Sequence, residues 1–387
     1  MKKTLLAAAL MAGFAGIAHA ETSVTLYGIV DGGVGYNKFK GTTAYDSNAA
    51  LRGNQISSKK TGLINGVQSG NRWGLKGSED LGDGLRAVFQ LESGFDLGTG
   101  DSSQARGTTT RLFGRQATLG LAGDSWGQLD FGRQTNIASK YMPGIVDPFG
   151  GGFDQANAGA AFTSINTVRY DNLITYQTPN FSGFQLGVGY SFNTNGPQAY
   201  KESNGVEQNQ RAITTGLRYA NGPIGLVATY DQRKTAETLV GANIVGGDTV
   251  KAWNVGASYD FEVVKASLGF GQTRDGLFSP QSFSGVGLGN NLNGKGLKVN
   301  SYVVGLSAPV GAGNVMASWT MAAPRSAPDA FQNTNSEMKK QNVYSLGYTH
   351  PISKRTNVYA IGSYAKNVHF LPDAKSTLVG VGLRHQF

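Results

Sequence analysis

The strongest constraint in this 387-residue sequence is the alternation of apolar residues with polar or small residues in many short segments. In 184–193, for example, Phe, Leu, Val, Tyr and Phe alternate with Gln, Gly, Gly, Ser and Asn. Successive side chains of a β-strand point to opposite faces, so such a segment predicts a strand with one apolar and one polar face. The same period recurs in 85–92, 314–321 and 379–384, and no comparably long segment has an equally clear helical period.

The connections between the predicted strands alternate between short turns and long polar stretches. Residues 80–84 and 179–183 are short turns that contain Gly or Pro. The long stretches are about 37–66, 96–110, 194–210, 233–249, 274–297, 323–341 and 367–375. Counting predicts roughly 16 strands in an up-and-down meander, with all long loops on one side. The predicted strands lie near 24–36, 68–79, 85–95, 111–122, 127–133, 168–178, 184–193, 211–220, 224–232, 250–260, 263–273, 298–308, 314–322, 342–350, 357–366 and 375–387.

The composition indicates which face of this sheet meets water. Glycine is the commonest residue type, at 56, and charged residues make up 15%, against about a quarter in soluble domains. A face of Gly, Ser, Asn, Gln and Thr cannot fill a dry core at native density, but it suits a water-filled lumen. An apolar outer face with Tyr and Phe near strand ends suits lipid. The sequence therefore predicts an all-β, 16-stranded antiparallel transmembrane β-barrel, with a secreted soluble β-protein such as an adhesin as the alternative.

The first 20 residues have the pattern of a cleaved secretory signal peptide. Lys2 and Lys3 precede an uncharged apolar run over 5–17, and Ala-His-Ala at 18–20 is a cleavage motif. Losing these two lysines would lower the net charge of the chain from +9 to +7. Since no other apolar run reaches 18 residues, the destinations are the periplasm, the medium or an outer membrane, in the last case as a barrel spanning 21–387.

Several kinds of chemistry have no support in the sequence. It has no cysteine, which excludes disulfides and thiolate metal sites. The histidines of 21–387 are His350, His369 and His385, which are not at metal-ligand spacing. The basic residues form no cluster or motif of the kind that binds nucleic acid. We therefore predict no cofactor, no metal and no nucleic-acid partner.

Several segments resemble the general diffusion porins of Gram-negative bacteria, in particular the anion-selective β-proteobacterial type. They are SVTLYGIVD at 23–31, RWGLKGSEDLG at 72–82, FGRQA at 113–117, LDFGRQ at 129–134 and GLRHQF at 382–387. The resemblance covers the whole of 21–387. It implies an outer-membrane homotrimer, not an enzyme, that lets small hydrophilic solutes and inorganic ions diffuse passively. Outer-membrane lipids and lipopolysaccharide are implied partners, together with the assembly machinery that reads a final strand ending in Phe387.

The resemblance also implies a constriction. In this family the long loop after the fifth strand, here about 133–167, folds into the barrel, and it carries DPFGG at 147–151 where the family often has PEFGG. Arg72, Arg115 and Arg169 match a basic ladder on the barrel wall. The acidic groups expected opposite them are Asp147 and Asp154, and the further cations are Arg133 and Lys140. An excess of positive charge in a narrow lumen raises the local concentration of anions, so we predict anion preference.

The strand alternation supports only part of this assignment. Trp73 and Leu75 form an outer face, which places Arg72 inside. Arg115, however, shares parity with Leu119 and Leu121, so alternation alone would place it outside, and we follow the motif there. The alternative for each arginine is a charge on the rim above the membrane, because Arg on the lipid face at mid-depth costs about 2–4 kcal/mol.

Three other functions stay open from the sequence alone. The chain could be a solute-specific channel for sugars or an organic anion, an outer-membrane enzyme such as a protease or phospholipase, or an adhesin with a plugged lumen. A solute-specific channel needs an aromatic track, for which Tyr27 alone is insufficient, and an enzyme needs grouped catalytic residues. A measurement of ion flux distinguishes an open channel from a plugged barrel.

Overall fold

The computed structural model describes residues 23–42, 55–200, 205–241, 243–279, 283, 293–331 and 338–387. The predicted signal peptide, 1–20, and parts of the predicted long loops lie outside these ranges. No helix in the described ranges has both the length and the apolar character needed to cross a membrane.

Almost all regular structure in the described chain is β-strand. The first strands are β1 (Ser23–Thr42), β2 (Gln55–Asn65), β3 (Arg72–Gly82), β4 (Leu85–Gly94), β5 (Gln116–Gly123), β6 (Gly127–Thr135), β7 (Arg169–Gln177), β8 (Phe184–Ser191), β9 (Ala212–Asn221) and β10 (Ile224–Lys234). The later strands are β11 (Glu237–Val240), β12 (Asn243–Gly246), β13 (Thr249–Asp260), β14 (Lys265–Arg274), β15 (Lys298–Val310), β16 (Gly313–Ser326), β17 (Gln341–Pro351), β18 (Thr356–Lys366) and β19 (Lys375–Gln386). The helices are α2 (Ile137–Tyr141), α3 (Pro143–Val146), η2 (Asp154–Ala156), η3 (Ala158–Ala160), η4 (Asp329–Phe331) and η5 (Val368–Phe370).

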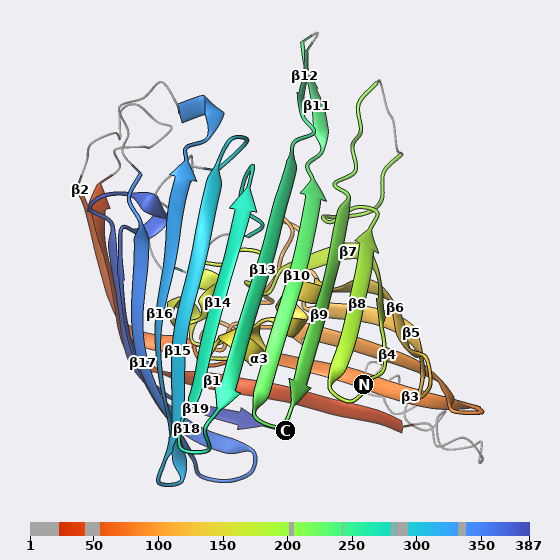
Figure 1. The fold of residues 1–387 in the computed structure, drawn as a ribbon, viewed down its shortest axis with the longest axis horizontal. Helices are drawn as coiled ribbons and strands as arrows, with labels where there is room; N and C mark the ends of the chain where they lie inside the picture. The colour runs from red at the N-terminus through yellow and green to blue at the C-terminus, as the bar shows by residue number, and fades with distance from the viewer. Residues whose placement is uncertain are drawn as a thin grey trace, which may run out of the picture.

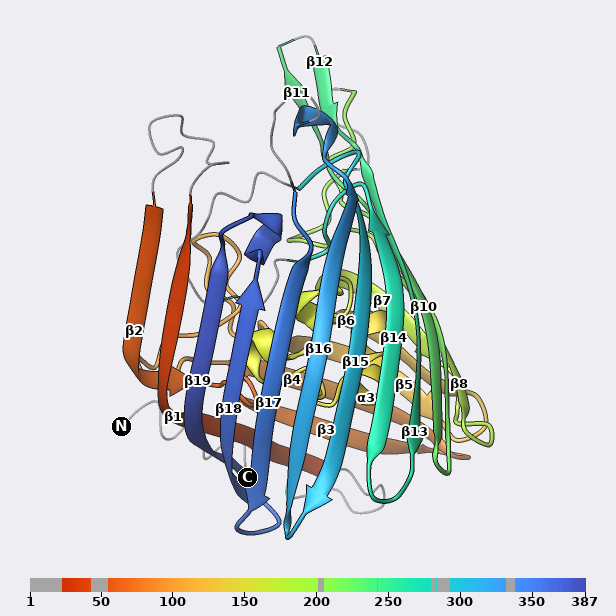
Figure 2. The same cartoon turned by 60° about the vertical axis from the view of Figure 1, so that its left-hand side comes forward.

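The strands close into an antiparallel barrel in which each strand pairs with its sequence neighbours (Figures 1 and 2). Closure comes from β1, which pairs with β19 from Ile29 opposite Gln386 to Lys40 opposite Lys375. On its other edge β1 pairs with β3 in its first part and with β2 in its second part. β2 and β3 are thus two halves of one barrel strand, interrupted at 66–71. With this pair counted once, and with the separate β11–β12 hairpin left out, the described strands form the predicted 16-stranded antiparallel barrel.

The main differences from the predicted strands lie at the ends of strands. β1 continues to Thr42 and β2 begins at Gln55, although 37–66 reads as loop, and β11 and β12 form a hairpin within the predicted loop 233–249. Lys59 and Lys60 on β2 are both exposed. These strand ends lack the apolar alternation because they extend beyond the apolar band, where both faces can be polar.

The two faces of the barrel wall differ in the way the alternation predicts. On β5, Leu119 and Leu121 are 64% and 38% exposed on the outside, whereas Thr118 is 6% exposed on the inside. Exposed apolar side chains recur at alternate positions on other strands, such as Leu186 and Val188 on β8. An outward apolar surface of this extent requires lipid around it.

The inner wall is not lined by water alone, because the segment 136–168 between β6 and β7 lies inside the ring of strands (yellow in Figures 1 and 2). Ile137, Met142 and Val146 of this segment are buried in the main apolar cluster. Glycines in the wall leave the space that the side chains of this segment occupy. A Cβ at Gly256 would collide with Val146, and one at Gly305 would collide with Pro148. Part of the small, polar inner face is therefore a dry packing surface.

We expect Gly256→Ala to lower the thermal unfolding midpoint in detergent, because the added methyl group overlaps Val146 and overpacking typically costs about 1–3 kcal/mol. Gly362→Ala on β18 is the matched control, since a Cβ there meets nothing within 4 Å. Equal midpoints for the two variants would contradict the close packing of the inserted segment against the wall.

Candidate functional site

The inserted segment is fixed to the barrel wall at its first residue. Asn136 Nδ2 donates to Asp231 Oδ1 on β10 at 2.7 Å and to the Ser164 carbonyl at 2.9 Å. The Ile137 N–H donates to Thr214 Oγ1 on β9 at 2.8 Å. These buried hydrogen bonds hold α2 against β9 and β10, which determines where the segment crosses the lumen.

Asp147 shapes the inserted segment from within. Its carboxylate accepts backbone N–H bonds from Phe149 at 3.0 Å, Gly151 at 2.8 Å and Ala158 at 3.1 Å. Burial raises the pKa of Asp147 to about 6, against the opposing effect of these three hydrogen bonds. The side chain is 7% exposed and does not line the cavity described next. The structure therefore places Asp147 as a brace of the Asp-Pro-Phe-Gly-Gly turn.

A cavity of about 740 Å³ lies between the inserted segment and the barrel wall. Its described lining contains one carboxylate, that of Asp154. Its cationic side chains are Arg72, Arg115, Lys140, Arg169 and Arg384. We call this space the arginine cavity. It brings together five of the predicted site residues and adds Arg384, while Arg133 and Asp147 lie outside its lining.

Strand direction explains why these arginines meet. Arg72 and Arg169 are the first residues of β3 and β7, and Arg115 directly precedes β5. These three strands run in the same direction around the barrel, so their first residues lie at the same end, away from the tight turns. Because Arg115 precedes the paired residues of β5, the alternation of side chains along β5 does not determine which way the Arg115 side chain points. Its side chain passes Gly70 and Gly94, where a Cβ would approach it to within about 3.2 Å and 3.1 Å.

Three of the arginines are held in place by a hydrogen bond from their Nε atom. Arg72 Nε donates to the Gly70 carbonyl, Arg169 Nε to the Arg115 carbonyl and Arg384 Nε to Ser69 Oγ, each at 2.9 Å. None of these three forms an ion pair with a carboxylate among the residues that the structure describes. Arg169 Nη1 also donates to the Thr167 carbonyl at 3.5 Å. The other terminal Nη groups, which carry most of the donors of a guanidinium, remain available to an anion.

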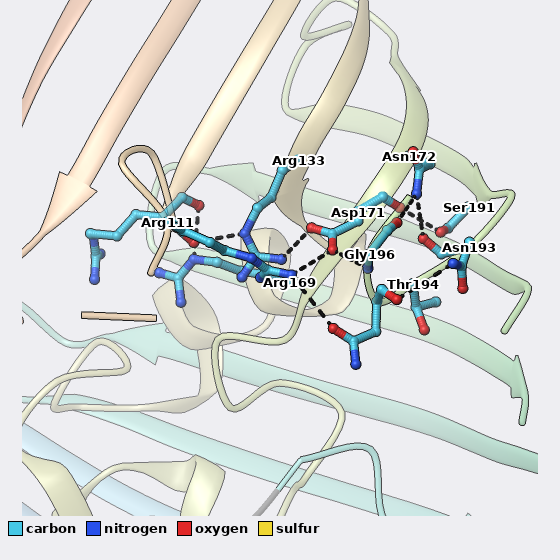
Figure 3. A network of polar contacts seen from close by, with 12 residues as sticks. Arg111, Arg133, Arg169, Asp171, Asn172, Ser191, Asn193, Thr194 and Gly196 are labelled. Atoms are coloured by element: carbon cyan, nitrogen blue, oxygen red, sulfur yellow. Dashed lines mark hydrogen bonds and ion pairs between the residues drawn. The ribbon is translucent and has the colours of Figure 1, made fainter. Parts of the chain in front are cut away.

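Two carboxylates form ion pairs with three arginines in and beside the cavity. Glu92 Oε1 forms an ion pair with Arg115 Nε at 2.6 Å. Asp171 on β7 bridges Arg111, at 2.7 Å, and Arg133, at 2.6 Å, as Figure 3 shows. The side chains of these five residues are only 10–17% exposed. Arg133 is thereby held beside the arginine cavity and shares the single negative charge of Asp171 with Arg111.

The remaining charges belong to the inserted segment. Lys140 Nζ donates to Gln134 Oε1 at 2.7 Å, and burial lowers the pKa of Lys140. Asp154 lies at the start of η2. Burial, together with the nearby charge of Asp31, raises the pKa of Asp154 to about 7. The one carboxylate of the arginine cavity can therefore bind a proton near neutral pH.

Four charged residues of this region are not among the predicted site residues, namely Arg111, Arg384, Glu92 and Asp171. For Arg384 and Glu92 the signal was present, since each alternates with apolar neighbours and so faces the lumen. Asp171 shares parity with Arg169 on β7, but its two partners lie 38 and 60 residues away along the chain. In the described ranges, no group of three or more His, Asp or Glu side chains is arranged to hold a metal ion.

Comparisons with known proteins agree with this architecture. A family model described as Gram-negative porin matches residues 7–369. An outer membrane porin protein of Bordetella pertussis is 54% identical over 405 residues, and outer membrane porin protein 32 of Delftia acidovorans is 34% identical over 411 residues; both alignments cover 100% of each chain. The solved anion-selective porin from Comamonas acidovorans has a TM-score of 0.68 and 30% identity, over 95% of this chain and 100% of that chain. The resemblance found in the sequence is thus confirmed, and the chain belongs to the Gram-negative porin family of outer-membrane β-barrels.

Proposed function

We propose that this porin is a passive, anion-preferring channel whose selectivity arises in the arginine cavity. The observation that carries the proposal is the charge balance there, with five cationic side chains, of which Arg115 is paired with Glu92, against the one carboxylate of Asp154 in the described lining. The anion-selective relative from Comamonas acidovorans supports the direction of the preference. The charges and the narrow lumen serve permeation, and we propose no enzymatic activity.

The cavity can attract anions without binding them tightly. A guanidinium stays charged at any relevant pH and offers paired donors to a carboxylate or phosphate. Arg72, Arg169 and Arg384 use their Nε atoms for hydrogen bonds within the protein, and Arg169 Nη1 also reaches the Thr167 carbonyl at 3.5 Å, so most of the Nη donors are left for an anion. An anion can therefore exchange part of its water shell for these donors and move to the next arginine, which is the balance of entry and release that conduction needs.

We also propose the assembly and processing that the sequence implies. Residues 1–20 would be removed as a signal peptide, and 21–387 would form a homotrimer in contact with outer-membrane lipids and lipopolysaccharide. The hydrogen bonds between Phe387 and Gly28, at 3.0 and 3.1 Å, join the last residue to β1, which fits a role for Phe387 in assembly. A homotrimer would migrate as a heat-modifiable band of three times the monomer mass on unboiled gels, whereas a band at the monomer mass would contradict it.

Replacing Arg72 and Arg169 together by Gln is expected to reduce the anion-to-cation permeability ratio severalfold, because two of the three unpaired arginine charges of the wall are lost. The measurement is the reversal potential in a salt gradient across a planar bilayer. Arg325→Gln, an exposed arginine at the end of β16, is the matched control and should keep the original ratio. An unchanged reversal potential in the double variant would place selectivity elsewhere in the lumen.

Asp171→Asn is expected to change selectivity in the opposite direction. Without its carboxylate, Arg111 and Arg133 lose their shared ion-pair partner and add uncompensated positive charge beside the cavity. The anion-to-cation permeability ratio should rise, and the thermal unfolding midpoint should fall. Asp124→Asn removes the partner of Arg86 at an exposed turn and serves as the control with an unchanged ratio.

The selectivity is expected to depend on pH through Asp154. Because its pKa is raised to about 7, lowering the pH from 8 to 5 protonates it, removes the one carboxylate of the cavity lining and increases anion preference. The folded state then binds this proton more tightly than the unfolded chain does. The contribution to stability is therefore fully present below about pH 4 and is lost as the pH rises through 7.

Asp154→Asn is the control for the pH dependence. It should have the high anion preference of the acidic state at every pH between 5 and 8, measured by reversal potential. A variant that retains the pH dependence of the unmodified protein would assign the titration to another group.

A further inference from the structure

The outer face of β13 to β16 carries cationic side chains at its loop-side end, the upper end of these strands in Figure 1. The register places Lys251 opposite Arg274 and Arg274 opposite Lys298, on three adjacent strands. Arg325 lies at the same end of β16, at the register shift opposite Lys298. The first three share parity with the outward apolar side chains of their own strands, such as Val255 on β13, so they leave the barrel on its outer face. We call these four cationic residues the basic row.

Acidic side chains do not compensate the basic row. None of its four members forms an ion pair with a carboxylate in the part of the chain that the structure describes. Asp275, the residue after Arg274, accepts a hydrogen bond from the Gly296 N–H at 3.0 Å. At the turn-side end of β13, by contrast, Asp260 and Glu262 are exposed. The positive charge of these strands is therefore concentrated at their loop-side end, which in an outer-membrane barrel is the extracellular end.

Two outward-facing amides orient the central arginine of the row. Arg274 Nε donates to Gln272 Oε1 at 2.6 Å, and Gln272 Nε2 donates to Asn300 Oδ1 at 2.7 Å. The register places these amides beside Trp253, and they are only 9% and 7% exposed. Arg274 is thus held through its Nε atom, which leaves its Nη donors to an anion outside the barrel.

An apolar groove of about 460 Å³ lies on the same outer face, further towards the tight turns. Phe270 and Tyr302, whose ring centroids are 5.0 Å apart, line its loop-side part. Deeper in the groove, Ala257 leaves a notch between its register partners Leu226 on β10 and Leu268 on β14. The full lining is Val255, Gly256, Ala257, Leu268, Gly269, Phe270, Tyr302, Val303, Val304 and Trp319.

The distance between the basic row and the groove fits an anionic glycolipid. Lys251 and Val255, which lies level with Phe270, are four residues apart, about 13 Å along the strand. A phosphate on the row would leave room for a sugar headgroup beside Trp253 before an acyl chain enters the groove. Several adjacent cations suit a lipid with more than one phosphate. Lipopolysaccharide has these parts, since its base is a phosphorylated sugar pair that carries several acyl chains.

We propose that the basic row and the apolar groove form a binding site for lipopolysaccharide, with its phosphates at Lys251, Arg274 and Lys298 and an acyl chain in the groove. The proposal rests on the contact with lipopolysaccharide proposed above and assigns that contact to β13 to β16. The lipid would cover the outside of the wall at Gly256, where the inside packs against Val146 of the inserted segment.

The test is a titration of the purified protein in detergent with fluorescently labelled lipid A, the bis-phosphorylated base of lipopolysaccharide. Replacing Lys251 and Arg274 together by Gln should weaken binding by about 10- to 30-fold, because each cation at an anionic lipid surface contributes about fivefold in affinity. Monophosphoryl lipid A should bind the unmodified protein more weakly, and phosphatidylglycerol more weakly still. Lys354→Gln with Arg355→Gln removes the same two residue types from an exposed tight turn and is the matched control with unchanged affinity.

Ala257→Trp tests the groove without a change of charge, because its ring would fill the notch and should weaken lipid A binding while the chloride current stays normal. An equal loss of affinity in the row variant and the turn variant would overturn the site, as would a preference for phosphatidylglycerol. Dissociation of the oligomer band by Ala257→Trp on unboiled gels would assign the groove to a second copy of the chain. Absence of lipid A binding to the unmodified protein would contradict the wider contact with lipopolysaccharide as well.

Discussion

The packing of the inserted segment against a glycine-bearing wall is the interaction on which the rest of the structure depends. Val146 and Pro148 occupy space that any side chain at Gly256 or Gly305 would fill. Asn136 and Asp231 fix the first residue of the segment by a buried hydrogen bond. Without this dry contact, the barrel would enclose a wide lumen in which no charged group of the wall would face a nearby surface.

The electrostatic design separates the positioning of the arginines from their charge. Arg72 and Arg169 are oriented by hydrogen bonds from Nε to backbone carbonyls. Because these acceptors are uncharged, they leave the positive charge of both side chains uncompensated. Asp171, in contrast, compensates one of the two positive charges of Arg111 and Arg133 beside the cavity. Selectivity can therefore change by substitution of one carboxylate, while the geometry of the unpaired arginines stays the same.

The alternation in the sequence was sufficient to predict the barrel, because lipid outside and water inside impose the same two-residue period on every spanning segment. It was insufficient where that constraint ends. β2, with Lys59 and Lys60, reads as loop because both of its faces can be polar. The sequence predicts that Arg115 lies within a strand, but β5 begins only at Gln116, so the parity of Arg115 indicates the wrong face.

The candidate site was less predictable, because it depends on contacts between distant segments. The motif indicates Arg72, Arg115 and Arg169. The composition of the 147–154 stretch, however, could not show that the Asp147 carboxylate accepts hydrogen bonds from three backbone N–H groups. The glycines were interpreted as water-facing, although Gly256 and Gly305 pack against the inserted segment. Alternation identifies the face of a residue, but it does not identify what covers that face.

The position of the arginines at one end of β3, β5 and β7 has a consequence for the current itself. Arg72, Arg115 and Arg169 lie at the loop-side ends of β3, β5 and β7, so three of the four guanidinium groups that line the cavity lie towards that mouth of the lumen. A pore whose fixed charge is concentrated towards one mouth conducts unequally at voltages of opposite sign. The current through a single barrel would therefore rectify, and the sign of the rectification would report which way the barrel is inserted in the membrane.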